Sequence, residues 1–254
     1  MPTITAEKVS KYYVTQKKFL RRSTGQREIG VEDVNLSIAQ GEFVYVIGSS
    51  GAGKSTLLQL LAGQLKPDSG TVLLNDRSLS GFRRRSGRLS RLIGFVPQET
   101  SLNRRIPIWE NLEHAAKASR ELLGSAERTA ERIQKVLGLT GMNGAEWKYP
   151  GELTAGECRR VELAKALINS PPILVLDEVT ARLDPDSMWD VFLLLTELNR
   201  KGTTVIMATH NSEYVNMLRR RVITLVHGRV YSDEDKGRFG EVKNYKNKPK
   251  PEAR

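Results

Sequence analysis

The first half of the chain carries short runs of β-branched and aromatic residues, a pattern typical of buried or half-buried strands. Four leucines between residues 57 and 61 then follow at helical spacing. The polar and basic segment 17–27 contains Gly25 and is predicted to be a loop. Strands are expected at residues 4–14, 31–38, 43–47, 71–74 and 92–96.

From residue 107 to about residue 148 the strand pattern stops and helical spacing takes over. We interpret this stretch as a helical subdomain inserted in an α/β core, with Trp109 and Trp147 in the subdomain's own core. After it, helices are expected at residues 161–168 and 189–198, and strands at residues 173–176, 203–208, 222–226 and 228–230.

These elements predict an α/β fold with a sheet flanked by helices. The expected division is a first part of the core at residues 1–98, the helical subdomain at 99–152, the second part of the core at 153–235 and a flexible basic tail at 236–254. The basic segment 82–91 is interpreted as a solvated surface, with a phosphate-facing or lipid-facing patch as the alternative.

The composition limits the classes of partner and the cellular location, but it does not identify one partner. The 40 Lys and Arg residues exceed the 29 Asp and Glu residues, which gives a formal charge of +11 and suggests an anionic neighbour such as a nucleic acid, a membrane surface or a charged ligand. Cys158 is the single cysteine, which excludes an intrachain disulfide and a cysteine metal cluster. No apolar run approaches the ~18 residues of a membrane span, and the first ten residues do not resemble a secretory signal, so we expect a cytoplasmic protein.

A glycine-rich stretch joins the predicted strand at residues 43–47 to the helix that follows it. Glycines allow the backbone to close around a phosphate, and the amides of the loop and of the helix start make an anion site. The lysine can reach the outer phosphates and the following hydroxyl can bind Mg²⁺. The stretch fits the pattern G-x-x-x-x-G-K-[ST] and runs Gly48, Ser49, Ser50, Gly51, Ala52, Gly53, Lys54, Ser55 and Thr56.

Asp177 and Glu178 directly follow the apolar run at residues 173–176. A carboxylate at the end of a central strand, facing a phosphate loop, is well placed for a Mg²⁺ ion, and a second carboxylate beside it can orient or deprotonate a water. Thr154 and Glu157 have the spacing of a helix-capping box. The same helix start is also a possible anion site, so both interpretations stay open.

Six elements in this order resemble the nucleotide-binding subunit of ABC transporter-type ATPases: GSSGAGKST at residues 48–56, Gln98, LTAGE at 153–157, ILVLDE at 173–178, LD at 183–184 and His210. The resemblance covers nearly the whole chain. It implies a P-loop ATPase core with an inserted helical subdomain, the cofactors ATP and Mg²⁺, and a dimer of two subunits that encloses two ATP molecules.

The resemblance also implies a role for each matching residue. Tyr13 stacks on adenine and residues 48–56 hold the phosphates. Ser55, Gln98 and Asp177 serve Mg²⁺, Glu178 is the catalytic base, and His210 contacts the terminal phosphate. The residues that act on the ATP of the opposite subunit are Leu153, Thr154, Ala155, Gly156, Glu157 and Asp184.

The chain departs from the family pattern at two places. Ala155 stands where a glycine is usual, which costs nothing in a right-handed helix start and would be unfavourable only at positive φ. Val179 follows Glu178 where a proline is usual. We therefore expect a working ATP site whose communication between subunits is altered.

Softer similarity, in VSKYY at residues 9–13, QETSLNRRIPIWENL at 98–112, MATHN at 207–211 and the segment 219–239, resembles the FtsE type of bacterial cell-division ATPase. That type works with the membrane protein FtsX in the control of cell-wall hydrolases. The alternatives are an ATPase subunit of a lipoprotein or drug exporter, a nucleic-acid-linked ATPase, and a nucleotide-binding module with little hydrolysis.

Overall fold

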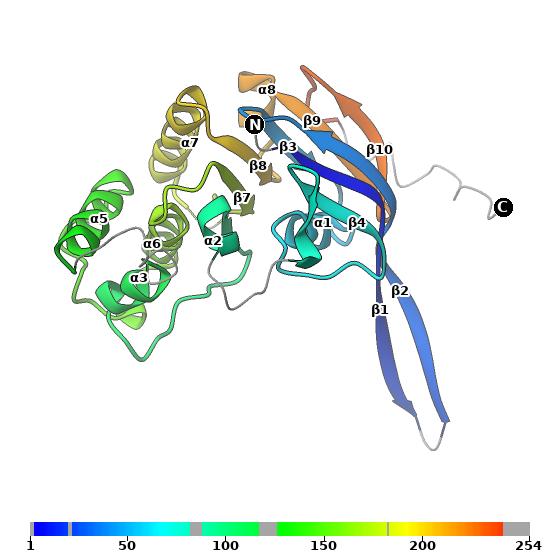
Figure 1. The fold of residues 1–254 in the computed structure, drawn as a ribbon, viewed down its shortest axis with the longest axis horizontal. Coiled ribbons are helices and arrows are strands. Elements are labelled where there is room, and N and C mark those ends of the chain that lie inside the picture. Colours follow the sequence, from blue (N-terminus) through cyan, green and yellow to red (C-terminus); the bar gives the residue numbers. More distant parts are fainter. Residues whose placement is uncertain (1–2, 20–21, 82–87, 117–125, 182, 241–254) are drawn as a thin grey trace.

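The computed structural model describes residues 3–19, 22–81, 88–116, 126–181 and 183–240. The described residues form a six-stranded and a four-stranded sheet, with most of the helices on one side of the larger sheet (Figure 1). Most of the basic segment 82–91, and the tail from residue 241, lie outside the described residues, so the interpretations of both stay predictions.

The larger sheet has the strand order β10-β9-β3-β8-β7-β6. The five strands β9, β3, β8, β7 and β6 are parallel to their neighbours, and in this sheet only β10 runs antiparallel to its neighbour, β9. Its strands are β3 (Phe43–Ile47), β6 (Ile93–Val96), β7 (Ile173–Asp177), β8 (Thr204–Ala208), β9 (Arg221–Val226) and β10 (Arg229–Glu234).

Both faces of this sheet are buried, as the β3 strand shows. Phe43, Tyr45 and Ile47 join one core cluster, and the alternate residues Val44 and Val46 join the other. The first cluster packs under α3 (Ile108–Ala116), α5 (Ala126–Leu139), α6 (Ala155–Leu167), α7 (Pro185–Arg200) and α8 (Ser212–Leu218). The second cluster includes α1 (Lys54–Leu61), which lies between the two sheets. Continuous apolar strands are what a sheet covered on both faces requires.

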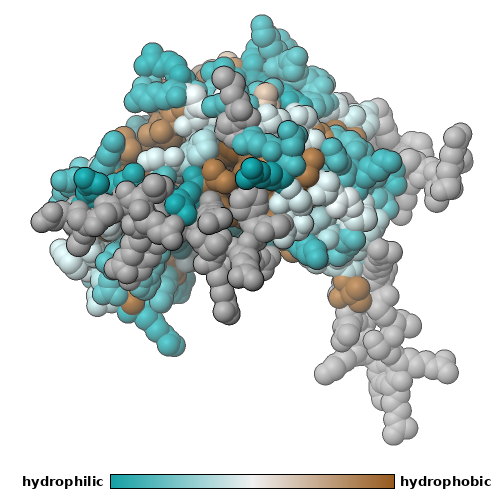
Figure 2. Space-filling model, viewed as in Figure 1, coloured by the Kyte–Doolittle hydropathy of each residue, from teal (hydrophilic) through white to brown (hydrophobic). Residues whose placement is uncertain are grey.

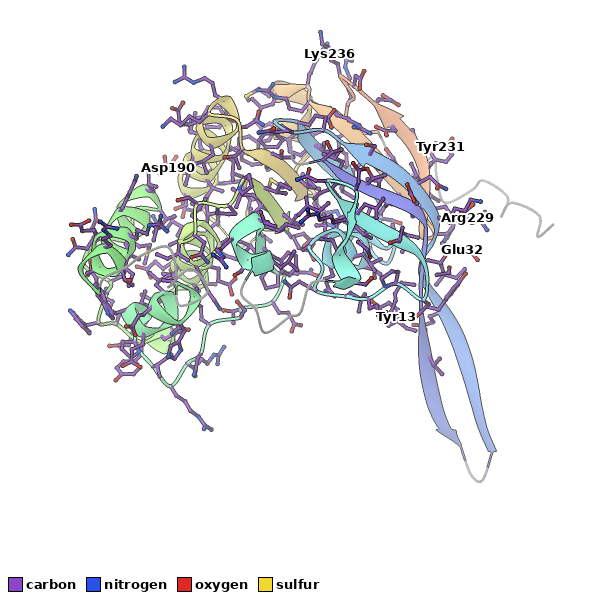
Figure 3. All side chains as sticks on the ribbon, viewed as in Figure 1. Tyr13, Glu32, Asp190, Arg229, Tyr231 and Lys236 are labelled. Carbon is purple, nitrogen blue, oxygen red and sulfur yellow. The ribbon has the colours of Figure 1, made fainter. Side chains whose placement is uncertain are left out.

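The smaller sheet is antiparallel and has the order β2-β1-β4-β5, with β1 (Ile4–Phe19), β2 (Arg22–Ile38), β4 (Ser69–Leu74) and β5 (Arg77–Ser78). An ion pair ties it to the larger sheet, because Arg229 on β10 lies 2.9 Å from Glu32 on β2 (Figure 3). The Tyr12 hydroxyl also donates to Glu32, at 3.2 Å.

The prediction of a loop at residues 17–27 was wrong. The backbone pairing of β1 with β2 continues to the Phe19–Arg22 pair, and Figure 1 shows the resulting hairpin projecting from the body. Antiparallel pairing is made by backbone N–H and C=O groups, so it does not require an apolar sequence. Figure 2 shows hydrophobic atoms where the hairpin leaves the body, and Val14 and Ile29 are exposed there.

The described part of the stretch after residue 107 carries the two helices α3 and α5, as predicted. α3 and α5 both pack on α6. Trp109 is partly buried against the core, but Trp147 is 70% exposed and stacks on Trp109 with ring centroids 5.6 Å apart. The prediction that Trp147 lies in a core was therefore wrong. Two short helices, α2 (Arg88–Leu92) and α8, were not predicted, since neither is long enough to show a period in the sequence.

The strand order explains how distant motifs meet. The carboxyl ends of β3, β8, β7 and β6 lie along one edge of the sheet, because these strands are parallel neighbours. The glycine-rich loop follows β3, His210 follows β8, Glu178 follows β7, and Gln98 follows β6. Ligand sites of parallel sheets lie at this edge.

Candidate functional site

The loop after β3 has the shape of an anion cradle. Gly53 adopts φ +100°, and a Cβ there would lie 2.2 Å from the Gly30 carbonyl oxygen, so no other residue fits without a backbone shift. The Lys54 side chain folds back along the loop, and its Nζ donates to the carbonyl oxygens of Gly48 and Ser49 at 3.1 Å each. Burial lowers the pKa of Lys54, and the charges of Glu178 and Asp177 raise it. The ammonium is thus held where it can meet a bound phosphate.

Asp177 ends β7 and is almost fully buried. Neither of its carboxylate oxygens has a hydrogen-bond partner among the described residues. Burial raises the pKa of this carboxyl, while the neighbouring Ser55 hydroxyl and the Lys54 charge lower it. A buried polar group without a partner is costly and calls for an explanation.

A divalent cation that comes with a phosphate ligand supplies that explanation. Mg²⁺ takes hard oxygen ligands and is bound by one or two carboxylates together with substrate phosphates, rather than by an all-protein cage. The described residues contain no group of three or more His, Cys, Asp and Glu side chains that would hold a metal ion by themselves. The orphaned Asp177 oxygens and the Ser55 hydroxyl therefore fit Mg²⁺ in that phosphate-assisted mode.

Glu178 is held between two side chains from neighbouring strands. His210 Nε2 lies 3.0 Å from Glu178 Oε1, and Gln98 Nε2 donates to Glu178 Oε2 at 3.1 Å. The backbone of Glu178 is left-handed, with φ +52°, and its amide donates to the Ala208 carbonyl oxygen at 3.1 Å. A left-handed conformation at a non-glycine residue stores strain, which is a common mark of functional sites.

One cavity of 260 Å³ lies over the glycine-rich loop, and Asp177 is not among the residues that line it. The described residues around it are Tyr13, Glu28, Ile29, Gly30, Ser50, Gly51, Gly53, Lys54, Ser55, Thr56, Gln98, Glu178 and His210. The Tyr13 hydroxyl lies 3.2 Å from Thr56 Oγ1, and Tyr13 sits at the base of the projecting hairpin (Figure 3). The structure thus brings together Tyr13, the loop and the three polar residues that follow β6, β7 and β8.

Sequence reasoning missed Glu28, Ile29 and Gly30 at this cavity. Glu28 pairs with Tyr13 across the β1–β2 ladder, so recognition of the hairpin would have placed it. The Tyr13 ring lies close to Gly30: a Cβ at this position would lie 2.7 Å from Tyr13 Cε2, so a larger residue would have to displace the ring.

The residues expected to act on a second subunit do not line the cavity. Thr154 is the N-cap of α6: its hydroxyl accepts from the Glu157 amide at 3.2 Å, and Glu157 accepts from the Thr154 amide at 2.8 Å. These bonds lower the pKa of the Glu157 carboxyl. Ala155 is the first residue of α6 and is not among the residues with positive φ.

Leu153, Gly156 and Asp184 complete this set. Leu153 is the extended residue just before the α6 cap, and Gly156 lies in the first turn of α6. Asp184 caps α7 by accepting from the Ser187 amide at 2.9 Å, and hydrogen bonding to Ser187 lowers the pKa of its carboxyl. The capping box predicted from the sequence is confirmed, and Ala155 is accommodated as predicted.

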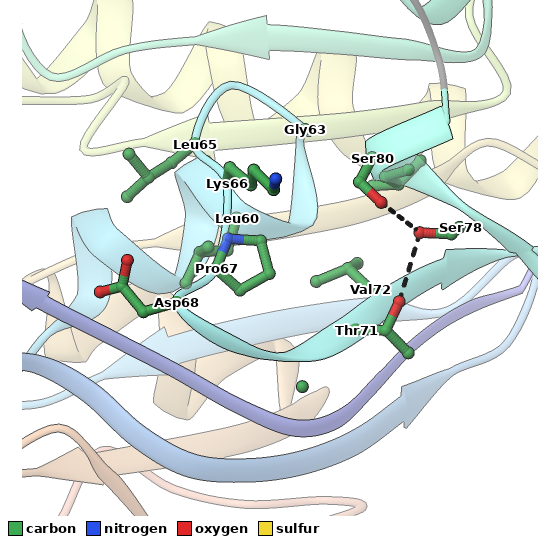
Figure 4. A pocket seen from close by; sticks show the side chains of 12 residues that line it. Leu60, Gly63, Leu65, Lys66, Pro67, Asp68, Thr71, Val72, Ser78 and Ser80 are labelled. Carbon is green, nitrogen blue, oxygen red and sulfur yellow. Dashed lines mark hydrogen bonds between the residues drawn. The ribbon is translucent and has the colours of Figure 1, made fainter.

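A larger cavity of 510 Å³ lies between the end of α1 and strands β4 and β5 (Figure 4). A hydroxyl chain runs along it, with Thr71 Oγ1 3.3 Å from Ser78 Oγ and Ser78 Oγ 2.7 Å from Ser80 Oγ. It contains none of the predicted site residues, so size alone would have pointed to the wrong place.

The fold and the site define a P-loop ATPase, and comparison with known proteins gives the family. Residues 31–181 match the ABC transporter family, so the chain belongs to that family and is one of its ATP-binding, ATP-hydrolysing subunits. The predicted fold and family are confirmed. Among the described helices, none is both long enough and apolar enough to cross a membrane.

The chain is 39% identical over 209 residues to the cell division ATP-binding protein FtsE of Streptococcus pneumoniae, a match that covers 82% of this chain and 89% of that relative. It is 36% identical over 233 residues to the methionine import ATP-binding protein MetN of Bordetella pertussis, covering 89% of this chain and 60% of that protein. A solved dimeric ATP-binding cassette in a post-hydrolysis state, bound to ADP and Pi, has a TM-score of 0.82 at 29% identity and covers 93% of this chain and 100% of that one.

Proposed function

We propose that two copies of this chain close around two ATP molecules and hydrolyse them to drive a membrane partner. The observation that supports the proposal is that one chain supplies only part of the expected site. Residues of the glycine-rich loop, Gln98, Glu178 and His210 line the cavity, while the capped start of α6 lies outside it. A helix N-terminus attracts phosphate. The dimeric cassette with ADP and Pi that resembles this fold supports the same arrangement.

Each side chain then has a chemical task. Tyr13 stacks on adenine, and Lys54 and the loop amides of residues 48–56 bind the phosphates. Ser55, Gln98 and Asp177 hold Mg²⁺, which neutralises charge on the phosphate oxygens when it is bound. Glu178 accepts the proton of the attacking water, and His210 holds the Glu178 carboxylate and contacts the terminal phosphate. Residues 153–157 and Asp184 of the second copy complete the site.

The membrane partner is proposed from similarity to FtsE. We infer a peripheral protein at the cytoplasmic face of the cell membrane, held there by an FtsX-like permease and acting in cell division through the control of cell-wall hydrolysis. The formal charge of +11 suits the anionic cytoplasmic leaflet. Residues 99–152 are proposed to form the helical subdomain, which α3 and α5 support.

The alternative hypotheses are a different membrane partner and a nucleic-acid partner. The similarity to MetN favours a subunit of a solute transporter as the second candidate, beside the lipoprotein or drug exporter. The test is purification of the tagged chain from its native membranes in mild detergent, followed by identification of the protein that accompanies it. A permease with a large extracytoplasmic domain that regulates a wall hydrolase supports the first proposal.

Two outcomes of the same work would contradict that proposal. A permease that binds a solute assigns the chain to a transporter, and turnover that is stimulated by RNA in the purified chain assigns it to the nucleic-acid-linked class. Lys54→Ala is the matched control in the membrane purification. It removes ATP binding and leaves the surface of the fold unchanged, so a comparison with the wild type shows whether capture of the partner depends on bound ATP.

A further inference from the structure

Three side chains of α6 contact the backbone that follows β6. Arg159 Nη1 donates to the Pro97 carbonyl oxygen at 2.5 Å. Glu162 accepts from the Ser101 amide, and Lys165 Nζ donates to the Ser101 carbonyl oxygen and to Ser101 Oγ at 3.1 Å each. The contacts therefore fasten the segment 97–101 at both of its ends.

Arg159 and Glu162 also bind each other, with Arg159 Nη1 2.9 Å from Glu162 Oε2. Glu162 is only 2% exposed and Arg159 8% exposed, so the ion pair is almost completely shielded from solvent. A buried ion pair is seldom retained for stability alone, because an apolar pair of similar volume is often as stable.

Gln98 lies inside the fastened segment, one residue after Pro97. Its side chain reaches the ATP cavity and donates to Glu178. The Arg159 charge is also close enough to Asp177 to offset a small part of the rise that burial causes in the pKa of that carboxyl. The contacts from α6 thus end near two of the three proposed Mg²⁺ ligands, Gln98 and Asp177.

We propose that Arg159, Glu162 and Lys165 are positioning residues that fix Gln98 at the ATP site from α6, the helix whose first turn is offered to the second subunit. The inference rests on the proposed function of Gln98 toward Mg²⁺. It adds to that function a link within one subunit, because α6 carries residues 155–157 at its start and holds the Gln98 segment one to three turns later.

The test replaces the ion pair by the apolar double variant Arg159→Met/Glu162→Met. It removes the Arg159–Pro97 and Glu162–Ser101 contacts, keeps those of Lys165 to Ser101, and leaves neither member of the ion pair without its partner. The expected result is a roughly tenfold rise in the Mg²⁺ concentration for half-maximal ATP turnover, as for other residues that orient metal ligands. Binding of a fluorescent ATP analogue in EDTA, and the melting temperature of the ligand-free chain, should stay near the wild-type values.

Combination with Gln98→Ala separates positioning from a general loss of structure. If the ion pair acts through Gln98, the triple variant has the Mg²⁺ requirement of Gln98→Ala alone. Glu197→Gln, which breaks an exposed ion pair on α7, is the matched control and should change neither readout. Effects that add, or an unchanged Mg²⁺ requirement in the double variant, overturn the inference.

A second variant covers the case in which the double variant does not fold. Lys165→Met removes only the contacts of Lys165 to Ser101 and should raise the Mg²⁺ requirement by a smaller factor. This effect should again not add to that of Gln98→Ala. An additive effect, or no effect, counts against the inference. If Gln98→Ala itself leaves the Mg²⁺ requirement unchanged, the role given to Gln98 is wrong and the inference falls with it. The assignment of Glu178 and Lys54 would stand, because their variants are read by turnover and by ATP binding.

Discussion

His210 Nε2 lies 3.0 Å from Glu178 Oε1, although 31 residues separate the two in the sequence. The contact follows from the sheet, because β7 and β8 are parallel neighbours whose last residues, Asp177 and Ala208, are paired. Each side chain leaves its strand at the same edge. With Gln98 on the other oxygen, the Glu178 carboxylate is held at the cavity from two sides.

Lys54→Ala should remove most of the affinity for ATP. The ammonium is held over the loop by two carbonyl oxygens, and its loss leaves bound phosphates without their nearest cation. We expect affinity to fall by about 30-fold or more, measured by titration with a fluorescent ATP analogue. Lys66→Ala, which lies at the larger cavity, is the control and should bind as the wild type does. Wild-type affinity for ATP in Lys54→Ala would contradict the assignment of the glycine-rich loop as the phosphate-binding site.

Asp177→Asn should stabilise the ligand-free chain while it abolishes Mg²⁺-dependent hydrolysis. The wild-type carboxylate is buried and unpartnered, so its replacement by a neutral side chain should raise the free energy of unfolding by about 1 kcal/mol at pH 7.5. Urea denaturation of both proteins without nucleotide measures the difference, and MgATP should then stabilise the wild type more than the variant. A less stable variant at pH 7.5 would contradict the stability cost that we assign to the buried Asp177 carboxyl.

The same pair of proteins should differ in pH dependence. Because burial raises the pKa of Asp177 in the folded chain above its ordinary value of 3.8, its contribution to stability is fully present below that value and is lost as the pH rises through the folded-state pKa. The advantage of Asp177→Asn should therefore shrink between pH 7.5 and pH 4.5. An advantage that grows on acidification would show that the pKa is lowered instead.

Ala155→Gly, which restores the residue usual in this family, should keep the ATPase active and slightly destabilise the chain. Ala155 is helical, so glycine relieves no strain and loses helix propensity, which costs up to about 1 kcal/mol. Thermal unfolding and steady-state turnover check the two parts. A more stable glycine variant would mean that Ala155 is strained in solution.

The sequence predicted the parts that depend on local pattern. The glycine-rich loop, the run of apolar residues before Asp177 and the Thr154–Glu157 capping box each carry their own signal, and the structure has them where the sequence places them. The prediction of a loop at 17–27 was wrong because a polar sequence lacks the apolar alternation by which a strand is recognised, while β1 and β2 pair there through their backbones.

The remaining features depend on distant contacts. No local pattern relates Gly30 to Tyr13, or Arg159 to Pro97, because strand pairing and helix packing bring them together. The roles of Tyr13, Gln98 and His210 came from family resemblance. The structure adds a physical basis for those roles by lining one cavity with all three.

Glu178→Gln offers the most direct test of a site shared by two copies. Loss of the base should reduce turnover by ~10² or more and leave ATP bound, so the closed dimer should persist. With MgATP, light scattering should give twice the 28.5 kDa of one chain for this variant, and a single chain's mass when Lys54→Ala is added. A Glu178→Gln protein that binds MgATP and keeps the mass of one chain at every concentration would contradict the account.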